Sequence, residues 1–152
     1  MIRADEAFAR LKRIPAYARV LPEHYRSMVH TQKFTSVASL GTQQAAQSFQ
    51  GGAVVLGITA AVIIPGVAAA TGQSARNRQL VGASFQFTNG DLITPGGPVQ
   101  LDSLMGSDGT HFPLREIVLA PNQSILATVE NYSTTVLNVE ISYHVMSFRF
   151  AS

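Results

Sequence analysis

The chain lacks cysteine altogether and is poor in charged residues. With no Cys among its 152 residues, a disulfide framework, a thiolate nucleophile and a cysteine-based zinc site are all excluded. Asp, Glu, Lys and Arg make up 13% of the chain, about half the share of an average soluble protein. Such a weakly charged surface favours permanent contacts over free diffusion. The length predicts one domain preceded by an arm.

The few charges are unevenly distributed. Residues 1–33 hold seven basic and three acidic side chains, a formal charge of +4, whereas residues 34–152 hold four basic and six acidic ones, a charge of −2. We therefore expect a basic arm over residues 1–33 that touches nucleic acid, an anionic membrane or an acidic protein surface, with a solvated amphipathic helix as the alternative. The candidate partner-binding residues are Arg3, Arg10, Lys12, Arg13, Arg19 and Arg26.

The arm has the pattern of two short helices. In "ADEAFARLKRIP", acidic residues stand at the start and basic ones toward the end, which suits the helix dipole, and Pro15 ends the segment. A second helix is predicted from Pro22 through "EHYRSMVH". Helices this short are marginal alone in water, so we expect them to order by docking. The carboxylates of Asp5 and Glu6 also argue against a secretory signal.

From residue 80 onward the apolar residues recur with a period of two. In "LVGASFQFTNGD", Val81, Ala83, Phe85 and Phe87 share one face of a predicted strand, and Asn89-Gly90 supplies turn chemistry. The Gly- and Pro-rich segment "TPGGPVQLDSLMGSDGTHFP" predicts a long surface loop with room for one short strand.

The last 38 residues or so give the clearest hairpin pattern. Strands are predicted at about 115–120 and 123–130 around a turn at Pro121-Asn122, and a second turn at "NYST" leads to a final strand. In that strand Val139, Ile141, Tyr143 and Val145 share a face, while Met146 has the opposite parity. The phase switch indicates a bulge or a face that is also buried.

The stretch "GGAVVLGITAAVIIPGVAAATG", residues 51–72, contains no charge. It is long enough for a membrane helix, but it is rich in β-branched residues, interrupted by Gly57, Pro65 and Gly66, and without flanking aromatic or basic anchors. We predict buried strands, with a bend at Gly57 and a turn at Pro65-Gly66. Burial on both faces would mean that the arm or another chain covers the outer side.

These patterns predict a mainly β fold. Several short strands with one apolar face indicate an antiparallel β-sandwich or barrel over residues 34–152, with a short helical N-terminal arm over residues 1–33. A doubly wound α/β sheet is disfavoured, because no helical pattern separates the strands after residue 80.

No residue pattern indicates catalysis, a metal or a cofactor, so we predict no enzyme. Glu140, Ser142 and His144 lie on one strand face, but no nucleophile turn accompanies them. Asp102, Asp108 and His111 lack the ligand pattern of a calcium loop. Nucleic acid binding is not expected, since the body is net acidic.

Two segments carry a resemblance to a known class of protein. They are "FQFTNGDLITPGG" and "FPLREIVLAPNQSILATVENYSTTVLNVEISYHVMSFRF", with a Pro-led strand, two polar turns and a final strand that ends in an aromatic-Arg signature. This half of the chain, about residues 80–150, resembles the small jelly-roll-like sandwiches of tailed-bacteriophage virion proteins.

The resemblance implies a capsid cement or decoration protein. Its expected partner is the major capsid protein or another virion protein, its expected state a homo-oligomer, and its expected location the virion, assembled in the host cytoplasm. Two alternatives stay open: a phage neck, tail or receptor-contacting protein, and a virion protein anchored in a membrane by residues 53–70.

Overall fold

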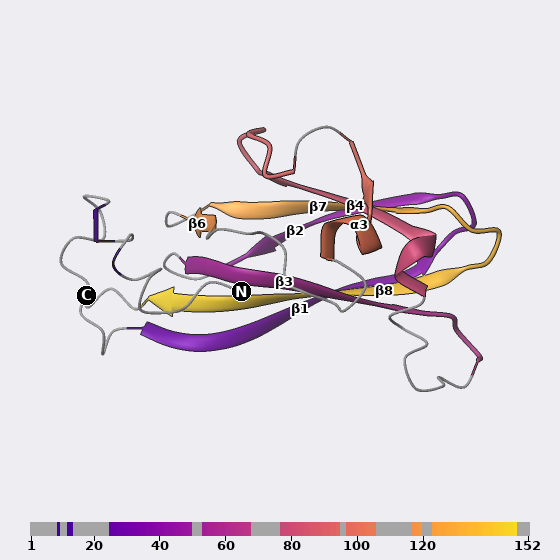
Figure 1. Ribbon diagram of the computed structural model, residues 1–152, viewed down its shortest axis with the longest axis horizontal. Helices are drawn as coiled ribbons and strands as arrows, with labels where there is room; N and C mark the ends of the chain where they lie inside the picture. Colours follow the sequence, from indigo (N-terminus) through magenta and orange to yellow (C-terminus); the bar gives the residue numbers. More distant parts are fainter. Residues whose placement is uncertain are drawn as a thin grey trace.

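The computed structural model describes residues 9, 12–13, 25–49, 53–67, 77–94, 97–105, 117–119 and 123–148. These residues form two four-stranded antiparallel sheets, a 3₁₀ turn and one short helix (Figure 1). Sheet A contains β1 (Tyr25–Val37), β3 (Ala53–Ile63), β6 (Ile117–Leu119) and β8 (Leu137–Phe148), and sheet B contains β2 (Thr42–Ser48), β4 (Val81–Phe87), β5 (Val99–Gln100) and β7 (Ser124–Asn131).

The strand order identifies the topology as a jelly roll. Sheet A runs β1-β8-β3-β6 and sheet B runs β2-β7-β4-β5. Except for the step from β4 to β5, each consecutive pair of strands lies in opposite sheets. Two Greek keys wound together give this arrangement of eight antiparallel strands in two layers. The predicted mainly β, jelly-roll-like sandwich is therefore confirmed.

Alternation of apolar residues places the core between the sheets. In β7, Ile125, Ala127 and Val129 are fully buried while their neighbours are half-exposed. In β4, Val81, Ala83 and Phe85 are buried as predicted. Their side chains meet the inner face of β8, where the ring centroids of Phe85 and Tyr143 lie 6.4 Å apart, edge to face. One apolar face on each sheet thus closes a single core.

The uncharged stretch at residues 51–72 forms a strand where the structure describes it. β3 covers Ala53–Ile63, and its pairing with β8 shifts register between Val55 and Gly57, which is the predicted bend. The chain then turns at Pro65-Gly66, where Gly66 adopts a φ of 79°. Among the described residues, no helix is long and apolar enough to cross a membrane.

The predicted hairpins at the end of the chain are wrong in their pairing. The strands lie where expected, but β6 pairs with β3, β7 pairs with β2 and β4, and β8 pairs with β1 and β3. Each turn therefore carries the chain from one sheet to the other. A period of two locates a strand but does not name its neighbour.

The predicted second helix of the arm is also wrong. Residues 25–30 of "EHYRSMVH" belong to β1, which pairs with β8 along its length and crosses residue 33. Of residues 1–24, the structure describes Ala9, which is helical, and Lys12 and Arg13, which lie in an exposed turn. A separate helical arm over residues 1–33 and a domain over residues 34–152 stay predictions.

The phase switch in β8 coincides with burial on both faces and with the bulge that β3 makes against β8. Val145 and Met146 continue an unbroken register with β1, whereas the register with β3 shifts between His144 and Val145. The exposures of Val145 and Met146 are 2% and 0%. Val145 joins the core, whereas Met146 lies on the outer face beside Val54, which is also fully buried. Both residues lose their exposure within a single chain, so no second chain is needed to bury them.

The predicted loop after residue 91 is partly folded into the core. It contains the short strand β5 and a helix, α3 (Leu101–Met105), whose Leu101 and Met105 are fully buried. The Asp102 carboxylate lies 3.6 Å from Nε of Arg78, a buried residue in the 3₁₀ turn η3 (Arg78–Leu80). This ion pair joins α3 to the entrance of β4. The sequence pattern missed it because Gly and Pro dominate the segment's composition.

Candidate functional site

The predicted basic partner-binding residues are placed only in part. Lys12 and Arg13 are exposed in a turn, and the backbone of Arg26 pairs with Ser147 in sheet A. Arg3, Arg10 and Arg19 lie outside the described residues. The described residues therefore do not test whether these six residues share one surface, and their role stays a prediction.

The outer face of sheet A carries a row of polar pairs between neighbouring strands. Ser142 Oγ lies 3.2 Å from Thr31 Oγ1 on β1, and His144 Nε2 lies 3.2 Å from Thr59 Oγ1 on β3. Further along β8, Glu140 lies 3.9 Å from Lys33 Nζ, and both side chains are solvent-exposed. These are cross-strand contacts of the kind that stabilises sheets.

This arrangement does not assemble a catalytic triad. Glu140, Ser142 and His144 follow one another along β8, and each faces a different residue on a flanking strand. A triad needs the base within hydrogen-bond reach of the nucleophile and a third group that orients the base. These polar residues form cross-strand contacts on the outer surface of sheet A.

The described residues also contain no cluster of three or more His, Asp or Glu side chains suited to a metal ion. Asp102, one member of the acidic group considered above, faces Arg78 instead. The other two members, Asp108 and His111, lie outside the described residues.

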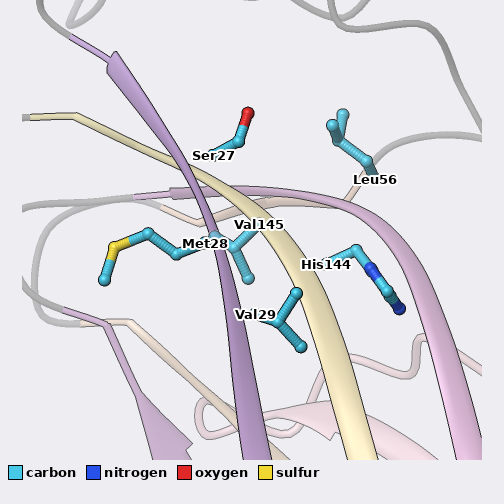
Figure 2. A pocket seen from close by; sticks show the side chains of 6 residues that line it. All are labelled: Ser27, Met28, Val29, Leu56, His144 and Val145. Atoms are coloured by element: carbon cyan, nitrogen blue, oxygen red, sulfur yellow. The ribbon is translucent and has the colours of Figure 1, made fainter.

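A pocket of about 290 Å³ opens where β1, β8 and β3 run side by side near one end of the sandwich (Figure 2). Its lining is mostly apolar and carries no carboxylate, Lys or Arg. Met28 and Val29 are 44% and 58% exposed there, large values for apolar side chains. The lining residues are Ser27, Met28, Val29, Leu56, His144 and Val145.

The bulge in β3 shapes this pocket. Because β3 shifts its register against β8 between Val55 and Gly57, the intervening Leu56 has no partner residue on β8. Its side chain lies outside the main core and lines the pocket, next to the pair formed by Val29 and His144. The sequence indicates the bend at Gly57 but not the pocket, because its pattern predicts a helix from Pro22 through residue 30.

The opposite end of the sandwich presents apolar side chains on turns. Leu40, in the β1–β2 turn, is 68% exposed, and Val136, in the β7–β8 turn, is 44% exposed. The two turns are joined, since Leu40 N–H donates to the Ser133 carbonyl at 3.1 Å. Leu40 has a φ of 54°, in the left-handed region that a leucine rarely adopts. No sequence pattern pointed to this turn.

Asn131 fastens the same end of the sandwich. It is 1% exposed, and its Nδ2 donates to the carbonyls of Val37, Ala38 and Thr135 at 3.1, 3.2 and 2.7 Å. Its Oδ1 accepts a bond from the Ser133 N–H at 2.8 Å. Asn131 begins an Asn-Tyr-Ser glycosylation sequence, but a side chain so buried and engaged has no room for a glycan.

Sheet B presents a broad surface with almost no charge. The four strands of this sheet contain one charged residue, Glu130. On the outer face, Gln44 Nε2 donates to Thr128 Oγ1 at 2.9 Å, and the hydroxyls of Ser48 and Ser124 lie 2.9 Å apart. These side chains hydrogen-bond to one another, so the outer face of sheet B can pack against another protein without burying an unpaired charge.

The fold and surfaces define a jelly-roll β-sandwich with an apolar pocket at one end and apolar turns at the other. Comparison of the chain with models of known protein families, with curated proteins and with solved structures found no match.

Proposed function

We propose that this protein is a non-enzymatic structural component of a tailed-bacteriophage particle, a cement or decoration protein that binds the major capsid lattice and stabilises the head. The observation that carries the proposal is the surface of sheet B, a complete four-stranded sheet with one charged residue, Glu130. A face of this kind suits a permanent protein contact better than free diffusion through water.

Two further features support the same role. The jelly roll is an architecture used by viral capsid proteins among others, although a fold alone does not imply a function. The basic residues of the arm, such as Lys12 and Arg13, are suited to an acidic surface on the partner. Many copies bound to one lattice would add their separate contacts through avidity.

Location within purified particles is the direct test. Antibody labelling of particles from the virus that encodes the chain should decorate the whole shell, and quantitative mass spectrometry should find tens to hundreds of copies. Label confined to the neck or tail, with a dozen copies or fewer, would support the tail alternative instead. Recovery with a lipid fraction would support the membrane alternative, and absence from particles would overturn all three.

The contribution of the arm is tested by rebinding to capsids stripped of the protein. Replacing Lys12 and Arg13 together by Ala should weaken rebinding, most clearly at low salt, because charge attraction between exposed groups is screened by ions. Lys33→Ala is a matched control for the loss of an exposed cation, since Lys33 lies on β1 in sheet A and not in the turn of Lys12 and Arg13. Equal loss of binding in both variants would contradict a specific role of Lys12 and Arg13.

A further inference from the structure

β1 runs along the long axis of the sandwich toward the β1–β2 turn (Figure 1), and the pocket lies near the start of this strand while the apolar turns lie beyond its end. β1 connects them, since Ser27, Met28 and Val29 line the pocket and Leu40 follows three residues after the strand ends at Val37. The eight residue steps from Val29 to Val37 along the strand span roughly 25 Å, and the turn to Leu40 follows beyond them. Leu40 therefore lies far from the pocket of its own chain, and only a second molecule can bring the two together.

Leu40 carries two unfavourable features. A leucine with φ of 54° costs roughly 1–2 kcal/mol relative to an extended or right-handed conformation. Its side chain is also 68% exposed, so it contributes little to the core. Gly or Asn at this position would avoid both costs. Strain of this kind at an exposed position points to a function in contact with a partner.

The pocket has the size and chemistry to receive such a side chain. Its volume of about 290 Å³ is roughly twice the ~150 Å³ that holds a benzene-sized group, and it lies just below the usual range of small-molecule sites. Val29 and Leu56 supply apolar walls, and neither the pocket nor the Leu40 turn carries a charged side chain. Leu40 fits this lining without desolvating a carboxylate, a Lys or an Arg.

We propose that copies of this chain associate head to tail, with the Leu40 turn of one copy inserted into the Val29–Leu56 pocket of the next. Such a contact joins two different surfaces, so it leaves a free turn at one end and a free pocket at the other. It generates closed rings or open filaments. The contact is small, so each one is weak, and association depends on protein concentration. The proposal stands apart from the assignment to a virus particle.

Sedimentation velocity of the purified full chain over a range of concentrations tests the association. Species larger than a monomer should grow with concentration. Leu40→Asn removes the apolar side chain and suits the left-handed backbone, so it should keep or raise thermal stability while weakening association about tenfold or more. Leu92→Asn is the matched control, because Leu92 is a 60% exposed leucine that belongs neither to the pocket lining nor to the Leu40 turn, and its replacement should leave association unchanged.

Mixing variants identifies the geometry. Leu40→Asn keeps an intact pocket, and Val29→Glu keeps an intact turn, so each should be monomeric alone and their mixture should stop at a one-to-one dimer. Association of Val29→Glu alone would indicate contact between two turns and overturn the proposal. A wild-type chain that stays monomeric at all concentrations, or a Leu40→Asn variant that associates normally, would overturn it as well.

Disulfide trapping checks the same contact without a disruptive charge. The chain contains no cysteine, so Leu40→Cys and Val29→Cys introduce the sole thiols. Under mild oxidation, a mixture of the two single variants should form a covalent dimer that contains one of each, and the double variant should form a ladder of covalent oligomers. Crosslinking of Leu40→Cys only to itself would contradict head-to-tail association.

Discussion

The Tyr143 hydroxyl donates a hydrogen bond to the Gln32 side-chain oxygen at 2.8 Å in the interior of the sandwich. Both residues are buried, and Tyr143 also meets Phe49 and Phe85 edge to face, with centroids 5.9 and 6.4 Å away. The bond joins β8 to the edge strand β1. It satisfies an amide oxygen that would otherwise be buried without a donor.

Removing this hydroxyl should destabilise the fold at neutral pH. Tyr143→Phe keeps the aromatic contacts but leaves Gln32 Oε1 without its donor, and we expect a loss of about 1–2 kcal/mol in the free energy of unfolding. Urea denaturation measures it. Tyr132→Phe is the control, because Tyr132 is 42% exposed and its hydroxyl makes only a long contact with the Pro98 carbonyl. Equal losses would mean that the buried bond contributes nothing of its own.

The same tyrosine predicts a loss of stability in alkali. Burial raises the pKa of Tyr143 above its ordinary value of about 10. A raised folded-state pKa means that this contribution to stability is complete below about pH 10 and is lost as pH rises further, since the unfolded chain then releases the proton more readily. The free energy of unfolding of the wild type should fall more steeply above pH 10 than that of Tyr143→Phe. Parallel curves would contradict the assignment.

Asn131 should be among the least replaceable polar residues. Asn131→Asp preserves its shape but turns a carboxylate oxygen toward the carbonyls of Val37, Ala38 and Thr135. The lost donors and the repulsion predict a destabilisation of about 3 kcal/mol or more, measured by urea denaturation. Asn138→Asp is the control, because the Asn138 side chain accepts a bond from Ser36 N–H and a carboxylate can do the same. Similar losses in both variants would contradict the donor role.

The Arg78–Asp102 pair should show strong coupling. Arg78 has 7% of its side chain exposed and Asp102 has 35%, so Asp102→Asn leaves a buried guanidinium without its counter-charge. We expect a loss of about 2 kcal/mol, at the lower end for buried pairs because Asp102 is partly solvated. The double variant Arg78→Met with Asp102→Asn should lose less than the two single losses added together. Strict additivity in denaturation experiments would show that the two residues do not interact.

Gly82 should tolerate no side chain while Tyr132 stays in place. A methyl group at Gly82 would overlap the Tyr132 ring and hydroxyl. Gly82→Ala is expected to cost about 1–2 kcal/mol, because overpacking forces the ring to move. In the double variant with Tyr132→Ala, the added methyl should cost much less than in the wild-type background. An unchanged cost in thermal denaturation would place the effect in the backbone at Gly82 instead.

The sequence predicted strands well where burial alternates. In β7 buried and half-exposed residues alternate strictly, and in β4 the buried Val81, Ala83 and Phe85 alternate with small or polar residues, so the period of two is visible in the residue types. β1 hides its period, because the inward positions include His30 and Gln32 and the outward ones include Val29. The alternation of polarity is therefore blurred at these positions, and Pro22, a residue suited to the first helical position, favours a helix from Pro22 through residue 30.

The pairing of the strands and the location of the two surface sites could not be predicted from the sequence, for a different reason. The pocket depends on Leu56 lying opposite no residue of β8, and the Leu40 turn depends on a bond to Ser133, 93 positions away in the chain. Both follow from register and sheet crossing, which the local pattern does not encode. The opposite holds for the basic arm. Its charge is evident from the sequence, but the structure describes only part of its residues.

The central place of β8 in sheet A has a consequence for how the protein is made. β1 and β3 do not pair with each other, and both take their partner from residues 137–148, more than 70 positions after β3 ends. During translation, backbone hydrogen-bonding groups and apolar side chains of β1 and β3 stay exposed until β8 has left the ribosome. Ordering of sheet A is therefore expected to be slow, and a nascent chain stalled before Leu137 is a substrate for chaperones or for aggregation.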